Sequence, residues 1–392
     1  MTVVKILFWT GVFLILYSYI MYPVILFIMS SIKKALDDSI YMFRKKDRRK
    51  TDNTSQVNVA VVISAYNEEK HIVERVKNLI EGQTYPEDKI SLYIGSDGSD
   101  DRTVELLQGL AYSNLHVFDY KENRGKVSVL NDLMNEVRED IVIFSDANTF
   151  FHEDNISCLV KYFKDEKVGA VCGELQLRAL DNSKNEDGVY WKYERFLKFH
   201  ESRISALLGA NGANYAIRKK YFEPFPADTI IDDFVSVLGI SMKGMKVIYA
   251  VDSSAYEEMP QTVRDEFKRR VRIGSGNYQA LFRNIKLLNP MYGMISFSFF
   301  SHKALRWLTP HLMLVVLVTN MFIDDSLYLY FLFLQLFVYF ISIGDMFFHY
   351  NDKMPVLARI LNMFISMNIA LLAGFYRYIS RSTTSSWART ER

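Results

Sequence analysis

Five short polar segments in the middle of the chain carry side chains that can handle phosphate, metal ions and nucleophiles. One surrounds an aspartate with small residues, two pair a carboxylate with a second oxygen, and two concentrate cations. Each pattern also occurs in ordinary turns and helix caps, so its meaning depends on what the fold brings together. The segments are Ser96-Asp97-Gly98-Ser99-Asp100-Asp101, Asn123-Arg124-Gly125-Lys126, Asp146-Ala147-Asn148, Ile230-Ile231-Asp232-Asp233-Phe234 and Lys268-Arg269-Arg270-Val271-Arg272.

The Asp146-Ala147-Asn148 segment directly follows an apolar run, Ile-Val-Ile-Phe. In an extended segment, side chains two residues apart point the same way, so the Asp146 carboxylate and the Asn148 amide oxygen can face one ligand. Both are hard oxygen donors of the kind that Mg²⁺ and Mn²⁺ prefer, and such an ion also holds phosphates. The alternative is a turn or a helix N-cap, where Asp and Asn are both common.

The first two segments suggest a binding site for a nucleotide. Asp97 can accept hydrogen bonds from a base or a ribose, and Gly98 lets the backbone approach that ligand. An ordinary turn in which Asp101 caps the next helix is the alternative. Lys126 opens a helix, and its charge adds to the attraction of helix N-termini for anions. A solvated basic turn is the alternative here.

The fourth segment suggests a general base, and the fifth suggests a binding site for an anionic leaving group. Asp232 and Asp233 follow an apolar pair. A carboxylate close to a nucleophile can remove its proton when its surroundings tune its pKa. A pair of capping residues is the alternative. The cations of 268–272 can neutralise a diphosphate, because guanidinium groups bind phosphate well, or they can form a basic helix face on the membrane.

Alternating strands and helices would position these segments. Short apolar runs that end in polar residues predict buried strands within 57–69, 90–103, 115–120 and 140–148. Helices are expected at about 69–81, 103–110 and 127–137. This alternation predicts a twisted parallel α/β sheet. Ligands of such sheets bind beyond the carboxyl ends of the strands, so we expect the polar residues at one shared edge.

The N-terminal residues 6–31 contain no charged side chain and are long enough to cross a bilayer as a helix. The run exceeds the apolar part of a signal peptide and lacks a cleavage motif, which favours a membrane anchor. Lys33, Lys34 and the basic cluster at 44–50 follow it. By the positive-inside rule, the middle of the chain then faces the cytoplasm. Beside a membrane helix, such a cluster more often rests on anionic lipid than on nucleic acid.

Three further candidate spans lie at 308–323, 326–344 and 355–376. The apolar stretch 291–300 is too short to cross and is expected at the membrane surface or in a groove. Three spans would place the C-terminus outside, whereas its arginines favour the inside. The alternative that one of these three helices is re-entrant or lies flat on the membrane is therefore left open. The side chains expected as a headgroup-level anchor are His302, Lys303, Arg306 and Trp307, and the C-terminal arginines are Arg377, Arg381, Arg389 and Arg392.

The composition excludes several classes of protein. Among 392 residues, 49% are apolar and 23% charged, which excludes intrinsic disorder, a collagen-like chain and a disulfide-built scaffold. Cys158 and Cys172 show no zinc-site spacing, and a single pair in a region expected in the cytosol does not support a disulfide. A net charge of +2 does not indicate a nucleic-acid partner. The spans lack the ionisable pairs that mark ion pathways, which disfavours a transporter.

In this order and spacing, the segments from Val57 to Gln279 resemble the family 2 glycosyltransferases of the GT-A fold. In particular they resemble the membrane-bound bacterial synthases of hyaluronan, cellulose and poly-N-acetylglucosamine. The resemblance implies a Rossmann-like mixed α/β sheet domain over 51–285, on the cytoplasmic side. It is flanked by an N-terminal transmembrane helix with a basic segment (1–50) and by an interfacial helix with C-terminal transmembrane helices (286–392).

The resemblance also implies a role for particular residues. Asp233 falls in the family's Thr-Glu-Asp and would be the catalytic base, while Asp146 and Asn148 fall in its D-x-D and would hold a divalent cation, Mg²⁺ or Mn²⁺. The nucleotide-sugar would contact Ala65, Tyr66, Glu68, Asp97, Lys126 and Asp146. The acceptor and diphosphate would contact Gly212, Ala213, Asp232, Arg269 and Arg272.

The sequence departs from the family in three places. Ser96 stands where many relatives have Asp, and Asn148 lowers the negative charge at the metal. The Q-x-x-R-W motif of processive synthases falls on Arg269 to Ile273, where only the arginine at Arg272 is kept. The aromatic residue that would stack an acceptor sugar is missing there.

The resemblance implies inverting transfer of a sugar from a nucleotide-sugar, with a uridine nucleotide expected, to a glycan or lipid-linked acceptor. It places the reaction at the cytoplasmic face of a multi-pass protein of the cell membrane, in exopolysaccharide, capsule or cell-surface glycan synthesis. Export or assembly proteins are further expected partners. Two alternatives stay open: single addition to a lipid carrier, and a non-catalytic membrane scaffold that kept the fold.

Overall fold

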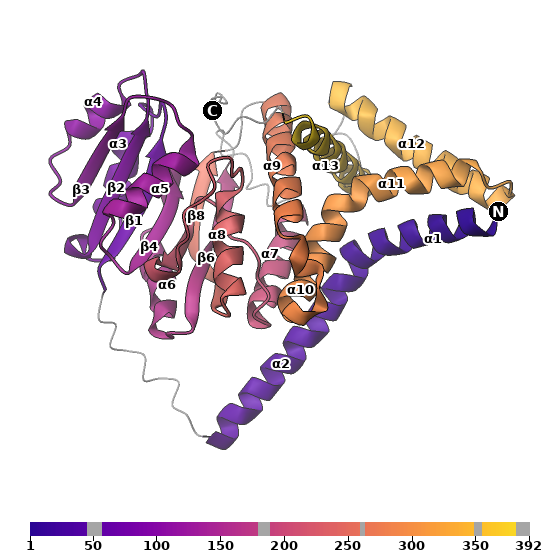
Figure 1. Cartoon of the computed structure of the whole chain (residues 1–392), viewed down its shortest axis with the longest axis horizontal. Helices are drawn as coiled ribbons and strands as arrows, with labels where there is room; N and C mark the ends of the chain where they lie inside the picture. Colours follow the sequence, from indigo (N-terminus) through magenta and orange to yellow (C-terminus); the bar gives the residue numbers. More distant parts are fainter. Residues whose placement is uncertain (45–56, 179–188, 259–262, 349–354, 382–392) are drawn as a thin grey trace. The chain divides into compact units, whose positions relative to one another are not determined.

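The computed structural model describes residues 1–44, 57–178, 189–258, 263–348 and 355–381 (Figure 1). They divide into two compact units: Ile28–Gln261 forms one, and Met1–Phe27 with Thr262–Thr383 forms the other. Part of the basic cluster, 45–50, and the C-terminal Arg389 and Arg392 lie outside the described residues.

The first unit is built on an eight-stranded mixed sheet in the order β3-β2-β1-β4-β7-β6-β8-β5. The strands β3, β2, β1 and β4 run parallel, as expected from the sequence, and β7 pairs antiparallel with both β4 and β6. The strands are β1 (Val59–Ala65), β2 (Ile90–Asp97), β3 (Leu115–Tyr120), β4 (Ile141–Asp146), β5 (Thr149–Phe151), β6 (Val168–Arg178), β7 (Tyr215–Arg218) and β8 (Lys246–Glu258).

Helices pack against both faces of this sheet. Successive side chains of β1 point to opposite faces, so Val61 and Ile63 pack with α3, while Ala60 and Val62 pack with α5. The helices are α3 (Ile72–Ile80), α4 (Thr103–Gln108), α5 (Lys126–Glu136), α6 (Asn155–Val160), α7 (Val189–Arg203) and α8 (Asp232–Met242). The helices predicted at 69–81, 103–110 and 127–137 are confirmed as α3, α4 and α5.

The register of the parallel strands brings their carboxyl ends to one edge. Ala65 pairs with Ser96 across β1 and β2, and Ser64 pairs with Asp146 across β1 and β4. Asp97 pairs with Tyr120 at the end of β3. The predicted shared edge is therefore confirmed, and the loops that follow β1, β2 and β4 all begin there.

The second unit is helical. Helix α1 (Thr2–Leu16) continues through a π-helical turn, Tyr17–Met21, directly into α2 (Tyr22–Arg44). Four helices in the described part of the chain are long and apolar enough to cross a membrane: Thr2–Met42, Met294–Met321, Ser326–Gly344 and Leu357–Ile379. Besides α1 and α2, the helices labelled in this unit are α9 (Val263–Arg283), α10 (Met294–Ser298), α11 (Leu305–Met321), α12 (Ser326–Phe348) and α13 (Val356–Ile379).

The start of the second span differs from the prediction in two respects. The stretch 291–300 is not a separate element, because α10 continues through the π-helical turn Phe299–Ala304 into α11 and lengthens that span, whereas its place at the membrane surface or in a groove stays a prediction. His302, Arg306 and Trp307 are buried within the helical unit instead of reaching a headgroup layer. The physical reason is pairing between helices: Ser18 donates to the Ser301 carbonyl (2.9 Å), so this region packs against α1 and its continuation.

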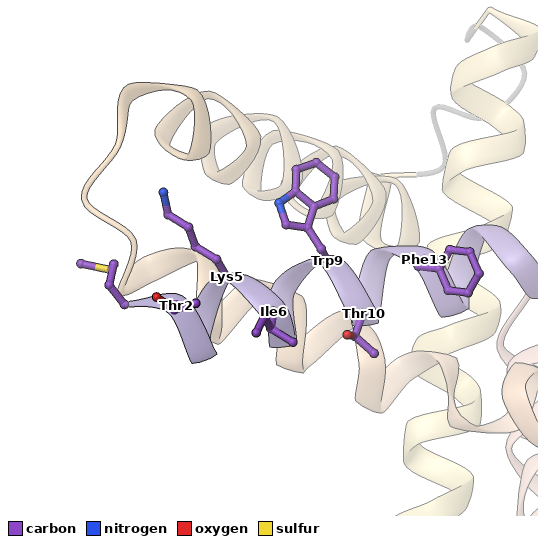
Figure 2. Close-up of a pocket in the computed structure, with 7 residues that line it drawn as sticks. Thr2, Lys5, Ile6, Trp9, Thr10 and Phe13 are labelled. Atoms are coloured by element: carbon purple, nitrogen blue, oxygen red, sulfur yellow. The ribbon is translucent and has the colours of Figure 1, made fainter.

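A shallow cavity of about 550 Å³ lies along α1 (Figure 2). Lys5 and Trp9, which point to the same side in the figure, both contact the start of α12: Lys5 Nζ lies 3.6 Å from Asp325, and Trp9 donates to the Tyr328 hydroxyl (2.8 Å). These contacts place the α11–α12 connection beside the N-terminus. None of the residues that line the cavity belongs to the predicted site.

Candidate active site

The loops after β1 and β2 are tied to each other by hydrogen bonds. The Asn67 amide donates to the Ser99 hydroxyl (3.1 Å), and the Asn67 side chain accepts from the Asp100 amide (3.0 Å). The Glu68 amide donates to Thr103 Oγ1 (2.8 Å). Asn67 has a φ of 55°, a left-handed conformation that Asn tolerates better than most residues. The loop that follows Ala65 and carries Tyr66 and Glu68 is thus fixed by the loop that follows Asp97.

Asp97 is completely buried and organises the start of α5. Its two carboxylate oxygens accept the backbone N–H groups of Arg124 (2.8 Å) and Gly125 (2.9 Å). Gly125 has a φ of 87°, which favours glycine, and it directly precedes the helix. Asp97 therefore sets the position of Lys126. Its expected contact with a base stays a prediction.

Lys126 joins two segments that are far apart in the chain. Its ammonium group lies 2.8 Å from Asp146 Oδ1 at the end of β4 and 3.5 Å from Asp232 Oδ2 at the start of α8. The second distance is that of an ion pair without a hydrogen bond. Burial lowers the pKa of Lys126, but the charges of Asp146, Asp232 and Asp233 outweigh burial and leave that pKa above its usual value. Lys126 therefore stays a cation.

Asp233 is half-buried beside this ion-pair network. Burial, followed by repulsion from Asp232, raises the pKa of the Asp233 carboxyl to about 6, although Lys126 and Lys198 act in the opposite direction. A carboxylate with a pKa near the working pH is suited to general-base catalysis. Gly212 faces this group: a Cβ atom there would lie 3.6 Å from the Asp233 carboxyl carbon.

The segment that contains Gly212 and Ala213 is held by its neighbours on the sheet. The Asn211 side-chain Nδ2 donates to the Gly173 carbonyl (2.7 Å), and the Ala213 carbonyl accepts from Ser145 Oγ (2.7 Å). Ser145 directly precedes Asp146. The predicted acceptor segment and the predicted metal segment are thus in direct contact.

The oxygen donors at this edge fit a hard divalent cation. Asp146 and Asn148 follow β4, and Asn148 donates to the buried Glu257 carboxylate (3.3 Å), so the Asn148 amide oxygen is the atom left for a metal. The described residues contain no cluster of three or more His, Cys, Asp or Glu that would enclose an ion. Mg²⁺ commonly uses one or two carboxylates together with substrate phosphates, which suits this donor set.

Four functional candidates were not predicted from the sequence: Arg75, Lys198, Tyr215 and Glu257. Lys198 donates to the Asn211 side chain, and Tyr215 is completely buried close to Asp232 and Asp233. Of these four, only Arg75 could have been recognised from the sequence pattern. It is a charged residue between Ile72 and Val76, on the apolar side of α3. The predicted diphosphate ligands Arg269 and Arg272 lie on α9, in the helical unit, and their role stays a prediction.

Residues 60–223 match the model of glycosyl transferase family 2. The chain carries a family 2 glycosyltransferase domain. The poly-β-1,6-N-acetyl-D-glucosamine synthase of Staphylococcus aureus (strain COL) is 25% identical over 260 residues, and that of Staphylococcus epidermidis is 23% identical over the same length. In both cases the match covers 63% of this chain and 62% of the relative.

The fold of the glycosyltransferase domain also has a counterpart among solved structures. A mannosyltransferase from Pyrobaculum calidifontis, solved in complex with GDP-mannose and Mn²⁺, superposes with a TM-score of 0.66 at 19% identity and covers 92% of this chain and 99% of that one. This similarity shows the fold, and the predicted GT-A architecture with flanking apolar helices is confirmed.

Proposed function

We propose that this protein transfers a sugar, with inversion, from a nucleotide-sugar to a glycan or lipid-linked acceptor. The observation that carries the proposal is the position of Lys126 between Asp146 and Asp232, with Asp233 beside them. This arrangement joins a phosphate-binding cation, a metal-binding carboxylate and a base of suitable pKa.

In this reaction, Asp233 takes the proton of the acceptor hydroxyl as the oxygen attacks the anomeric carbon. General-base catalysis of this kind contributes about 10²- to 10⁴-fold. Lys126 offers its charge to the diphosphate leaving group, and the fixed N-terminus of α5 adds its dipole. A bound Mg²⁺ or Mn²⁺, held by Asp146 and Asn148, would further neutralise the diphosphate.

The donor is proposed to be a uridine-linked hexose or N-acetylhexosamine. The support is the resemblance to poly-β-1,6-N-acetyl-D-glucosamine synthases, whose name specifies their product. A panel of labelled nucleotide-sugars, incubated with membranes that contain the protein and with Mg²⁺ or Mn²⁺, tests this. Polymer or a single adduct in the product distinguishes processive synthesis from single addition. If no nucleotide-sugar is consumed and metal-dependent nucleoside diphosphate binding is absent, transfer is excluded in favour of a scaffold.

We further propose that the glycosyltransferase domain faces the cytoplasm and that α13 lies along the membrane surface on that side. A Cβ atom at Gly374 of α13 would lie 2.7 Å from the backbone of Gly274 on α9, so the two helices touch. The charges of α9 are too costly for the hydrocarbon core, and α13 must stay with α9. With α13 at the surface, the cytoplasmic preference of Arg377 and Arg381 is satisfied.

Cysteine labelling tests this topology. On a Cys158→Ser background, Asp324→Cys lies in the α11–α12 connection and Ser380→Cys follows α13. In intact cells, a membrane-impermeant maleimide is expected to label Asp324→Cys, and to label Ser380→Cys only after permeabilisation. Labelling of Ser380→Cys in intact cells would show that α13 crosses the membrane.

A further inference from the structure

Arg75 is a completely buried arginine, and the proposed reaction assigns it no role. It lies on α3, which packs on one face of the sheet. Among the described residues, no carboxylate forms an ion pair with it, and its Nε atom has no hydrogen-bond partner. Burying a cation without a paired anion is costly, so a compensating interaction must exist.

The guanidinium contacts both ends of the segment that carries Asp146 and Asn148. Arg75 Nη2 donates to the hydroxyl of Ser145 (2.7 Å), the residue before Asp146. On the other side, the guanidinium carbon lies 4.4 Å from the ring centre of Phe151, at the end of β5. One side chain thus contacts a residue on each side of the Asp146–Asn148 segment: Ser145 directly before it and Phe151 three residues after it.

Two further hydrogen bonds extend these contacts into the surrounding fold. Arg75 Nη1 donates to Asn78 Oδ1 (2.6 Å), and the same oxygen accepts from the Phe151 amide (2.9 Å). The Ser145 hydroxyl, which accepts from Arg75, donates to the Ala213 carbonyl (2.7 Å). A continuous path therefore connects α3, the metal-binding segment and the acceptor segment.

Electrostatics point to Asp146 as the compensating anion. Burial lowers the pKa of Arg75 to about 9, and the charge of Asp146 is the largest influence in the opposite direction. At neutral pH the guanidinium therefore remains charged. Two cations therefore act on Asp146: Lys126 at 2.8 Å, and Arg75, which binds the preceding residue Ser145.

We propose that Arg75 is a positioning residue that holds the Asp146–Asn148 segment in its metal-binding conformation. The proposal rests on the proposed function, because it assigns Asp146 and Asn148 to the metal. Arg75 itself does not touch substrate: its contacts are Ser145, Asn78 and Phe151.

The test compares Arg75→Met and Arg75→Lys with Arg218→Met in the full chain. Arg218 is a matched control: its guanidinium donates to the Val168 carbonyl (2.9 Å), and its position in β7 pairs with Ile141, at the opposite end of β4 from Asp146. Mn²⁺ binding is measured by electron paramagnetic resonance with the metal alone and with metal plus UDP, together with thermal unfolding, kcat and KM.

For Arg75→Met we expect Mn²⁺ affinity to fall about 10- to 100-fold, as for other residues that orient metal ligands, with a matching loss of kcat. Arg75→Lys keeps the charge and is expected to recover part of that affinity. Arg218→Met is expected to lower the unfolding temperature without a change in Mn²⁺ affinity. Unchanged Mn²⁺ affinity in a folded Arg75→Met protein, or an equal loss in Arg218→Met, would overturn the proposal.

Ser145→Ala provides a second route if Arg75→Met does not fold, because it removes one hydroxyl and keeps the backbone. Its Mn²⁺ affinity should also fall, by a smaller factor than in Arg75→Met, and wild-type affinity in this variant would contradict the proposed path. Failure of this proposal can be distinguished from failure of the proposed function. Sugar transfer by the wild-type protein tests the reaction, whereas Mn²⁺ binding by the variants tests the role of Arg75.

Discussion

Charged side chains are held in two different ways at the end of β4 and on α9. Lys126 pairs with Asp146 and Asp232, which the sheet and α8 bring to it from distant parts of the chain. On α9, Lys268 pairs with Asp265 at 3.0 Å, only three residues away. An isolated helix would form the second kind of pair, but only the complete fold forms the first. The charges at the end of β4 therefore depend on the complete fold, whereas the pair on α9 needs only its own helix.

The largest effect is expected from Asp233→Asn, which keeps the shape of the side chain but cannot accept a proton. Transfer should fall by about 10²- to 10⁴-fold, while UDP binding is retained. Labelled product and UDP affinity are the measurements. Asp252→Asn is the matched control, because Asp252 pairs with Lys161 at the surface, away from the proposed base. Equal activity of Asp233→Asn and the wild type would show that another group is the base.

Lys126→Met is expected to lower kcat by about 10²- to 10³-fold, the size seen when one preorganised hydrogen-bond donor is removed from an active site. It also leaves Asp146 and Asp232 without their shared cation, so the unfolding temperature should fall. Lys161→Met is the control, since it breaks an exposed pair of the same type. If both variants kept full activity, the network around Lys126 would have no catalytic role.

The pH dependence follows from the raised pKa of Asp233, about 6. The base must be ionised, so kcat/KM should be constant above about pH 7 and fall tenfold per pH unit well below pH 6. A raised pKa also means that the folded protein binds this proton more tightly than the unfolded chain. The resulting stabilisation is complete below the unfolded pKa and is lost as the pH rises through 6. Asp233→Asn should therefore unfold at a temperature no lower than the wild type at pH 7.5.

The smallest effect is expected on α9. Lys268→Met removes a pair whose lysine is 58% exposed, and such pairs contribute about 0.5 kcal/mol or less. Thermal unfolding should shift by no more than about 1–2 °C. A shift comparable to that of Lys126→Met would mean that the two regions do not differ in the way proposed.

Local patterns were sufficient to predict much of the fold. Strand β3 matches its predicted range of 115–120, because short apolar runs with polar ends are set by neighbouring residues. The convergence of Asp97, Lys126 and Asp146 on one edge was predicted from strand direction alone. Arg75 and Glu257 were missed, because the burial of a charged residue depends on partners from other elements. The burial of His302 was missed for the same reason.

In the proposed reaction, one glycine would set how much room an acceptor has beside the base. Gly212 has no side chain, and a single methyl group added there would already lie in van der Waals contact with the Asp233 carboxyl. If the acceptor binds where we propose, its permitted bulk could be adjusted at this one position. Larger residues there would then exclude branched or substituted sugars before they changed the donor side of the site.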